Sequence, residues 1–523
     1  MIKSINNRKA YIIGSGIAGL STAVFLIKDA GFDGKNIFIF DKNKTSGGSL
    51  DGHDLAKSGY LVRGYRMFER EVYLCTYDLL SKIPSPNNRS KTLKDDIFDF
   101  NKKVKIQAKA RLIEKGQIVN AHKLGLNWQD RYKLVKLLLW PENFFASKSI
   151  NSYFTVDFFK TNFWLEWATT FAFEPWHSLL EMKRYMVRFI HTTSSIDTME
   201  VVVSAPYCEY DFMVRPVIDW LKQNQVNFRQ NYNVDDIELD QDHHTKIVTS
   251  ISFVNNKKSI KVQSGDLVFV TNGSITASSS AGSMTKMPNN NFLNHKSLWQ
   301  KIAKKSADFG QPNVFFQSIN KSSFESFTIT FDNELFFELV EKLTGNLAGT
   351  GGLITFKGSN WLMSIALPYQ PYFINQPKNV FVCWGYGLLP NKIGNYVKKK
   401  MSGCTGQEIL EELCAHLGFT EYRGSIIAQA NCVPVMLPYI TSQFMPRHKN
   451  DRPLVVPKGS KNLAFIGQYV EIKNEIVFTV ESSVRSAKIA VKKLLNLNNK
   501  VPLLYQRQYN IRFIVRAIMT ILR

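Results

Sequence analysis

The chain has 523 residues, of which 44% are hydrophobic and 21% are charged. Its 66 Lys and Arg residues outnumber its 43 Asp and Glu residues, which gives a formal net charge of +23. The hydrophobic fraction excludes an intrinsically disordered chain, which combines low hydrophobicity with high charge, and the length predicts about two to four domains.

The first 41 residues predict a nucleotide-binding unit made of a strand, a glycine-rich turn, a helix and a second strand. These elements are residues 10–13, 14–19, 20–28 and 37–41. The segment before them is polar and basic, and the sequence has no apolar run long enough for a signal sequence or a membrane-spanning helix. We therefore expect a cytoplasmic protein.

The turn carries the dinucleotide-binding motif Gly-x-Gly-x-x-Gly. Gly14 permits the tight turn, Gly16 leaves room for a pyrophosphate at the helix N-terminus, and Gly19 lets the helix pack close to the strand. Asp41 can accept a hydrogen bond from a ribose hydroxyl, although it lies further along the chain than the usual ~20 residues. Other cofactor contacts expected here are Ile17, Ala18 and Lys42. The alternative is a glycine turn without a ligand.

Later features favour FAD over NAD. Gly47 and Gly48 follow Asp41 closely, as in FAD proteins with the glutathione-reductase-like topology. A strand at residues 266–270 leads into a Thr-Asn-Gly loop, and a strand at residues 463–466 ends at Gly467. These loops could also be ordinary turns. The further FAD contacts predicted are Gly48, Ser49, Arg66, Thr271, Asn272, Ser274, Gly467 and Gln468.

The predicted fold class is α/β, a Rossmann-like FAD-binding domain of glutathione-reductase-like topology with an inserted α+β substrate domain and a C-terminal helical segment. We expect the FAD-binding domain to take residues 1–110, 200–300 and 425–495, the substrate domain 111–199 and 301–424, and the helix 496–523. The six cysteines show no metal-ligand spacing, so we expect reduced, mostly buried thiols and no metal site.

The C-terminal tail predicts a basic amphipathic helix over residues 505–523. Arg512, Arg516, Thr520 and Arg523 share one face, and most of the remaining circumference is apolar. Such a helix is a candidate interfacial membrane anchor, and the alternative is a helix docked on the protein or at a homodimer interface. A nucleic-acid partner is not expected, because the basic residues are scattered and no recognised module is present.

Seven unusual strings are the most specific motifs in the chain. They are RGYR (63–66), RYMVRF (184–189), TGGLITF (350–356), WGYG (384–387), CTGQEIL (404–410), PYITSQFMPR (438–447) and GQYVEI (467–472). Through them the chain resembles the bacterial oleate hydratases, a fatty acid double-bond hydratase family once called myosin-cross-reactive antigens, over about residues 9–490. The resemblance implies FAD, best reduced, and addition of water to an isolated cis double bond of a free fatty acid without net redox.

The resemblance also implies catalytic residues. Tyr207 begins the string YCEY, where the family has Tyr-Asn-Gln-Tyr, and is our expected proton donor. A phenol has a pKa near 10 in water, so it can protonate an alkene only in a dry, electrostatically supported site. Many members place a water-activating Glu where this chain has Met67. Glu69, or less readily Glu71, could substitute; otherwise another group acts, or water adds without a base.

The family holds the substrate carboxylate with polar side chains after the WGYG string. Asn391 and Asn395 have the matching spacing, and Gln230 is a weaker candidate; all three could also be ordinary loop or surface residues. Two other functions remain open: an FAD oxidoreductase for an apolar substrate, similar to a desaturase or amine oxidase, or a flavin- and lipid-binding protein without turnover.

Overall fold

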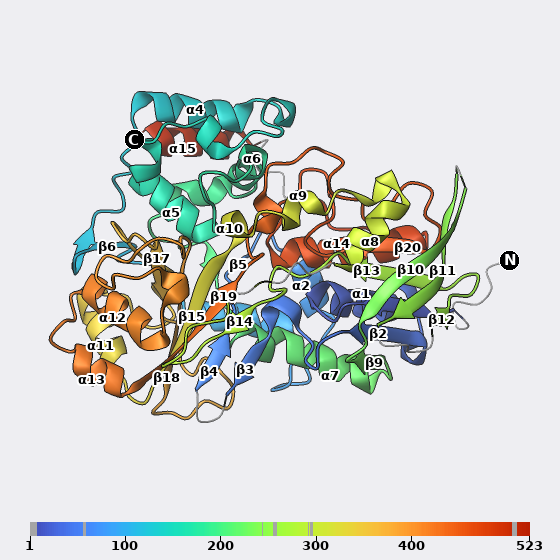
Figure 1. Cartoon of the computed structure of the whole chain (residues 1–523), viewed down its shortest axis with the longest axis horizontal. Coiled ribbons are helices and arrows are strands. Elements are labelled where there is room, and N and C mark those ends of the chain that lie inside the picture. Colours follow the sequence, from blue (N-terminus) through green and yellow to red (C-terminus); the bar gives the residue numbers. More distant parts are fainter. Residues whose placement is uncertain are drawn as a thin grey trace.

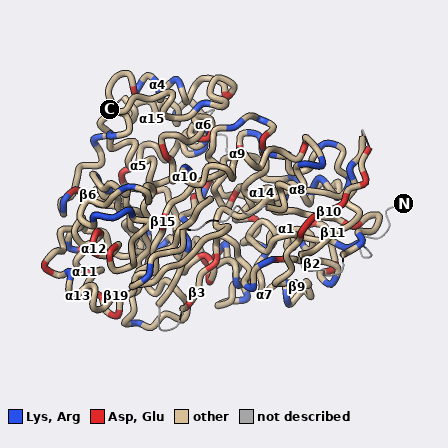
Figure 2. The backbone as a smooth tube through the Cα atoms, in the orientation of Figure 1, with Lys and Arg blue, Asp and Glu red and all other residues tan. Residues whose placement is uncertain are grey.

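The computed structural model describes residues 8–55, 59–242, 244–254, 259–290, 292, 297–504 and 510–522. Two large sheets lie side by side along the long axis of the molecule, and a group of helices covers one end (Figure 1). Lys and Arg are distributed over the whole backbone in the same view (Figure 2).

The first sheet is parallel and is assembled from distant parts of the chain. From edge to edge its strands are β20 (Leu463–Ile466), β13 (Leu267–Thr271), β1 (Ala10–Ile13), β2 (Ile37–Asp41) and β9 (Asn227–Gln230). The central strands are apolar throughout because helices cover both faces of such a sheet. A three-stranded antiparallel sheet, β10 (Val234–Gln241), β11 (Lys246–Phe253) and β12 (Ile260–Lys261), follows β9 in sequence.

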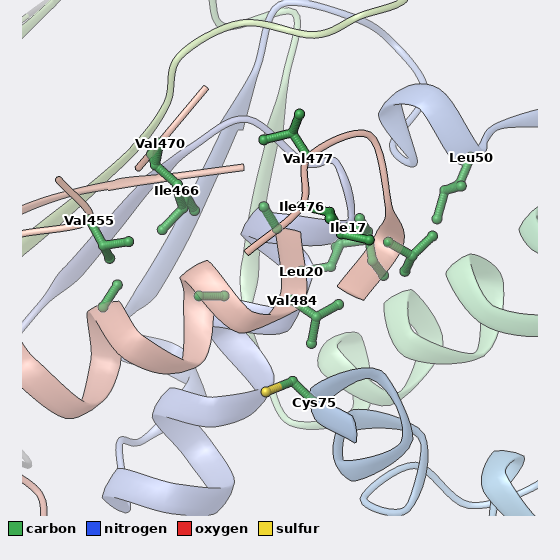
Figure 3. Close-up of a cluster of buried hydrophobic side chains, with 14 of the residues drawn as sticks. Ile17, Leu20, Leu50, Cys75, Val455, Ile466, Val470, Ile476, Val477 and Val484 are labelled. Atoms are coloured by element: carbon green, nitrogen blue, oxygen red, sulfur yellow. The ribbon is translucent and has the colours of Figure 1, made fainter. Parts of the chain in front are cut away.

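The helices α1 (Ile17–Ala30) and α14 (Val480–Leu494) pack against each other and against this sheet. Figure 3 shows part of the shared core, in which Leu20 of α1, Ile466 of β20 and Val484 of α14 are fully buried. Burial of each such side chain contributes about 1.5–3 kcal/mol. The core therefore holds the N-terminal turn against a strand that lies more than 400 residues later in the chain.

The second sheet has eight strands and is mostly antiparallel. Its order is β14 (Ser280–Ala281), β19 (Ala430–Leu437), β15 (Phe324–Phe331), β18 (Phe381–Gly387), β17 (Met363–Ala366), β16 (Ile354–Phe356), β6 (Leu112–Glu114) and β7 (Gln117–Val119). Helices α11 (Leu335–Thr344), α12 (Gly406–Leu417) and α13 (Arg423–Ala428) pack on one face. The predicted domain limits at 300 and 425 cut through this sheet, because β14 and β19 belong to it; the division into domains stays a prediction.

The helical end of the molecule contains α4 (Trp128–Leu139), α5 (Asn162–Phe171), α6 (Leu179–Arg188) and α15 (Ile511–Leu522). α15 lies beside α4, and Arg131 of α4 donates a hydrogen bond to the carbonyl of Leu522 (Figure 1). α15 begins at Ile511, and the predicted helix residues 505–509 and Arg523 lie outside the described residues. The predicted fold class is confirmed. Among the described residues, no helix has the length and apolarity needed to cross a bilayer.

A buried ion cluster joins α6 to the segments after β19 and β20. The carboxylate of Glu181, which is fully buried, lies 3.0 Å from Nη2 of Arg447 and 3.1 Å from Nη1 of Arg452. Glu471 lies 2.7 Å from Arg447 and 3.0 Å from Arg184. Burial alone would raise the pKa of Glu181, but Arg452 and Arg447 outweigh it and lower that pKa to about 2. Three of the unusual strings, RYMVRF, PYITSQFMPR and GQYVEI, therefore contribute residues to one ion cluster.

Candidate active site

A cavity of about 1000 Å³ opens at the carboxyl ends of β1, β2, β13 and β20. Ligands of parallel α/β sheets bind at this edge. The cavity is lined by residues of the glycine-rich turn, of the segments after β2, β13 and β20, and of the second sheet. Of the predicted cofactor residues, those in its wall are Gly14, Gly16, Ile17, Ala18, Asp41, Lys42, Gly48, Ser49, Thr271, Ser274, Gly467 and Gln468.

Two of the three motif glycines have no room for a side chain. Gly14 has φ +103°, and a Cβ placed there would lie 2.2 Å from the hydroxyl oxygen of Thr271. A Cβ on Gly19 would lie 2.0 Å from the carbonyl oxygen of Gly14. A Cβ on Gly48 would lie 3.1 Å from the Cα of Gly16, so two backbone segments approach each other closely at the cavity wall. Gly19 itself supports the turn and does not line the cavity.

The site has polar groups that fit a dinucleotide. Gly16 begins α1 without a side-chain cap, so the first N–H groups of the helix face the cavity, where a pyrophosphate would bind. Within the described residues, neither polar atom of the buried Asn272 amide has a hydrogen-bond partner, and neither has Nη2 of Arg66. Neither residue lines the cavity directly. Asp41 accepts hydrogen bonds from Ser15 N–H at 2.8 Å and Ser15 Oγ at 2.7 Å, and its carboxylate keeps further acceptor capacity.

The two residues expected to be catalytic lie outside the cavity wall. Tyr207 is half-buried and precedes the π-helix Tyr210–Val214. Glu69 ends β5 (Phe68–Glu69) and is 4% exposed. Its Oε2 accepts from the N–H groups of Glu71 at 2.7 Å and Val72 at 2.5 Å, and its Oε1 lies 3.0 Å from Nε2 of His191. The Glu69 carboxylate is thus already engaged, and its proposed role in water activation stays a prediction.

His191 was not expected near Glu69. Ligand-type atoms of Glu69, Glu71 and His191 lie within 4.8 Å of one another, although the sequence predicts no metal site. No local sequence pattern reveals this group of residues, because 120 residues separate His191 from Glu71.

The three predicted carboxylate-binding residues do not lie together. Gln230 is exposed on the edge strand of the parallel sheet, and its Nε2 lies 3.5 Å from Ser46 Oγ. Asn391 is exposed in the loop after β18. Asn395 accepts from the N–H of Asn360 at 2.7 Å and donates to a backbone carbonyl at 2.9 Å, so it fixes a loop. None of the three lines the large cavity. Their binding role stays a prediction.

Comparison with known proteins agrees with the strings found in the sequence. The family model described as the MCRA family matches residues 7–492. The chain belongs to the MCRA family. It is 39% identical to an oleate hydratase of Streptococcus pyogenes serotype M49 (strain NZ131), over 98% of this chain and 90% of that one. It is 34% identical to a linoleate hydratase of Lactiplantibacillus plantarum, over 94% and 93% of the two chains. The predicted resemblance and the hydro-lyase class are confirmed.

Solved structures share the fold of this MCRA-family chain. Cyclohexylamine oxidase from Brevibacterium oxydans aligns with a TM-score of 0.54 at 12% identity, covering 94% of this chain and 99% of that one. Wild-type putrescine oxidase bound to putrescine aligns with a TM-score of 0.51 at 9% identity, with the same coverage. At such identity the likeness concerns the fold alone.

One charged residue that lines the cavity of this MCRA-family chain was not predicted from the sequence. Arg63, the first residue of the RGYR string, donates to Asp51 at 2.7 Å, to Ser279 Oγ at 2.9 Å and to the carbonyl of Gly48 at 3.0 Å. Nε2 of His53 lies 3.1 Å from the same Asp51. Burial raises the pKa of Asp51, but His53 and Arg63 outweigh it, so the carboxylate stays ionised. The RGYR string could have indicated Arg63, but only Arg66 of that string was predicted to contact the cofactor.

Proposed function

We propose that this MCRA-family enzyme binds FAD and adds water to an isolated cis double bond of a free unsaturated fatty acid, without net redox. The observation that carries the proposal is the composition of the cavity: its dinucleotide-type end continues into apolar walls made by Leu61, Trp299, Phe316 and Val435. An apolar chain and a dinucleotide would therefore share one space. The hydratases named above support the choice of reaction and substrate.

In this proposal the glycine turn and the loops after β2, β13 and β20 hold FAD. When bound and reduced, FAD would supply charge and shape beside the double bond. Tyr207 protonates one alkene carbon, and water adds to the other. Buried aromatic side chains keep bulk water out, which a phenol needs in order to protonate an alkene.

Replacing Tyr207 tests the reaction. We expect Tyr207→Phe to lose at least about 100-fold in the rate of hydroxy fatty acid formation from oleate, because general acid catalysis contributes about 10²–10⁴-fold. The measurement is product analysis by mass spectrometry with oxidised FAD, with reduced FAD and without FAD. Tyr210→Phe, in the same string, is the matched control and keeps the wild-type rate.

Other outcomes separate the alternatives. Reduction of FAD by the substrate without incorporation of ¹⁸O from labelled water would identify an oxidoreductase instead. Tight binding of FAD and oleate without product in the wild-type protein would identify a binding protein. An unchanged rate in Tyr207→Phe would remove that residue from the mechanism.

We further propose that the helical end of the molecule binds an anionic membrane surface. α15 packs against the rest of the protein through Ala517 and Ile521, which are each 1% exposed. Other apolar residues of this helix face the solvent. Arg512 and Arg516 are exposed on the same helix. Exposed aromatic residues lie on and after the neighbouring α4. The exposed apolar residues of this end are Trp128, Tyr132, Leu139, Trp140, Phe144, Ile511, Val515, Met519 and Leu522.

The arginines of α15 should control this binding. Each contributes about 1 kcal/mol near an anionic bilayer, so the double variant Arg512→Ala/Arg516→Ala should bind about 30-fold more weakly. Co-sedimentation with vesicles containing phosphatidylglycerol measures the effect. The control is Arg229→Ala/Lys261→Ala, two exposed cations on β9 and β12 far from α15 (Figure 1). A concentration-dependent dimer that the α15 variant abolishes, with vesicle binding unchanged, would show that a second copy covers this surface.

A further inference from the structure

A second buried carboxylate lies in the string that contains Tyr207. Glu209 is 3% exposed, and its Oε1 accepts a hydrogen bond of 2.7 Å from the backbone N–H of Arg66. Its Oε2 lies 3.5 Å from the hydroxyl of Tyr372. Arg66 directly precedes Met67, the position where many family members have a Glu. The hydrogen bond from Arg66 N–H therefore places the Glu209 carboxylate beside the position where this chain has a thioether.

The surroundings of Glu209 suit an acid–base group. Tyr65 and Met67 pack into the same apolar cluster as Tyr372 and Trp384, and the rings of Tyr65 and Tyr372 are 6.1 Å apart. An ionised carboxylate offers about four lone-pair positions. The carboxylate is contacted by the N–H groups of Arg66 and of Glu209 itself and by the Tyr372 hydroxyl, which leaves a position that can accept a hydrogen bond from a water molecule.

The charge state of Glu209 agrees with such a role. Burial raises the pKa of Glu209 to about 7, and the backbone hydrogen bonds and Arg66 hold it from rising further. The titratable and charged groups that face it are Tyr65, Arg66, Cys208 and Tyr372. A general base works best when its pKa is near the operating pH.

We infer that Glu209 is the base that activates water in the hydration reaction, and this inference rests on the function proposed above. In this reaction the Tyr207 hydroxyl gives its proton to one alkene carbon, and the oxygen of a water molecule forms a bond with the other alkene carbon. The proton lost by that water goes to Glu209. After the product has left and water has entered the site, return of this proton to the Tyr207 phenolate restores both groups, so the net change is alkene plus water to alcohol.

The test is the isosteric variant Glu209→Gln, whose amide oxygen can still accept from Arg66 N–H. We expect kcat to fall about 100-fold with KM for oleate and FAD binding within about threefold. Wild-type kcat should fall as the pH drops through about 7, because a protonated carboxyl cannot take a proton, and the residual activity of Glu209→Gln should lack this limb. The control is Glu325→Gln on β15, a fully buried acid without a hydrogen-bond partner among the described residues, which should keep the wild-type rate and profile.

A rescue variant separates catalysis from structure. Met67→Glu combined with Glu209→Gln restores a carboxylate one residue from the Glu209 contact, and we expect it to recover at least tenfold of the lost rate. A Glu209→Gln protein with wild-type kcat and pH profile overturns the inference while the proposed function stands. A wild-type protein that makes no hydroxy fatty acid would contradict the proposed function itself. A loss of rate that comes with lost FAD binding, and that Met67→Glu does not rescue, shows a structural role and also overturns the inference.

Discussion

Gly19→Ala is expected to abolish FAD retention. The new methyl group would lie 2.0 Å from the carbonyl oxygen of Gly14 and 3.2 Å from a methyl of Ile12, so α1 must move away from β1. Both atoms belong to fixed backbone or core, and overpacking of this kind costs about 1–3 kcal/mol. The displacement falls on the turn that lines the cavity, so we expect FAD affinity to fall more than about 100-fold.

Flavin absorbance of the purified protein and fluorescence titration of the apoprotein measure this effect. The matched control is Gly424→Ala: this glycine is also helical, but a Cβ there meets nothing within 4 Å. It should bind FAD normally. Wild-type flavin content in Gly19→Ala would mean that the helix can move without disturbing the cofactor turn, and the motif would lose its assigned role.

Glu181→Ala is expected to lower the free energy of unfolding by about 3–5 kcal/mol, because removing one partner leaves buried charges uncompensated. Among the described residues, Arg447 and Arg452 would then share only Glu471, which lies 2.7 Å from Arg447 and 4.0 Å from Arg452. Urea unfolding followed by tryptophan fluorescence measures the change. Glu421→Ala, at an exposed turn position, should stay within about 0.5 kcal/mol of wild type.

The pH dependence gives an independent check on the same cluster. The folded-state pKa of Glu181 is about 2, against about 4.3 for an unperturbed Glu. A lowered pKa stabilises the folded state above the unfolded value and loses that contribution as the pH falls through the folded one. Wild-type protein should therefore lose stability between about pH 4.5 and pH 2 by a step that Glu181→Ala lacks. Parallel acid-unfolding curves for the two proteins would contradict the assignment.

Local patterns predicted the parallel sheet and its glycine turn well. The strands at 10–13, 37–41 and 463–466 match the structure, and the strand predicted at 266–270 is shifted by one residue, to Leu267–Thr271. Buried parallel strands are short apolar runs with turns at their ends, so the local pattern reveals them. Sequence spacing did not predict which loops meet in space. Asn391 was chosen through the resemblance and Gln230 from its position after a strand. Gln230 lies on the parallel sheet and Asn391 in the loop after β18 of the other sheet, and only long-range packing decides that.

The string that contains Tyr207 shows the same limit at the level of one side chain. Tyr207 was selected by resemblance, whereas Glu209, two residues later, was overlooked because glutamate is usually a surface residue. Only the folded chain shows that Glu209 is 3% exposed and that its carboxylate accepts a hydrogen bond from Arg66 N–H. Burial of a charged group depends on partners more than 100 residues away, and no window of the sequence contains them.

The order of strands in the parallel sheet also sets when this protein can fold during its synthesis. β13 pairs on one side with β1, but its other side waits for β20, which is made last. At about 5–20 residues per second, that wait lasts roughly 10–40 s. An apolar strand with an open edge pairs readily with other chains, so the nascent protein is most prone to aggregate in this interval. A cofactor that needs Gly467 can be loaded only after nearly the whole chain has left the ribosome.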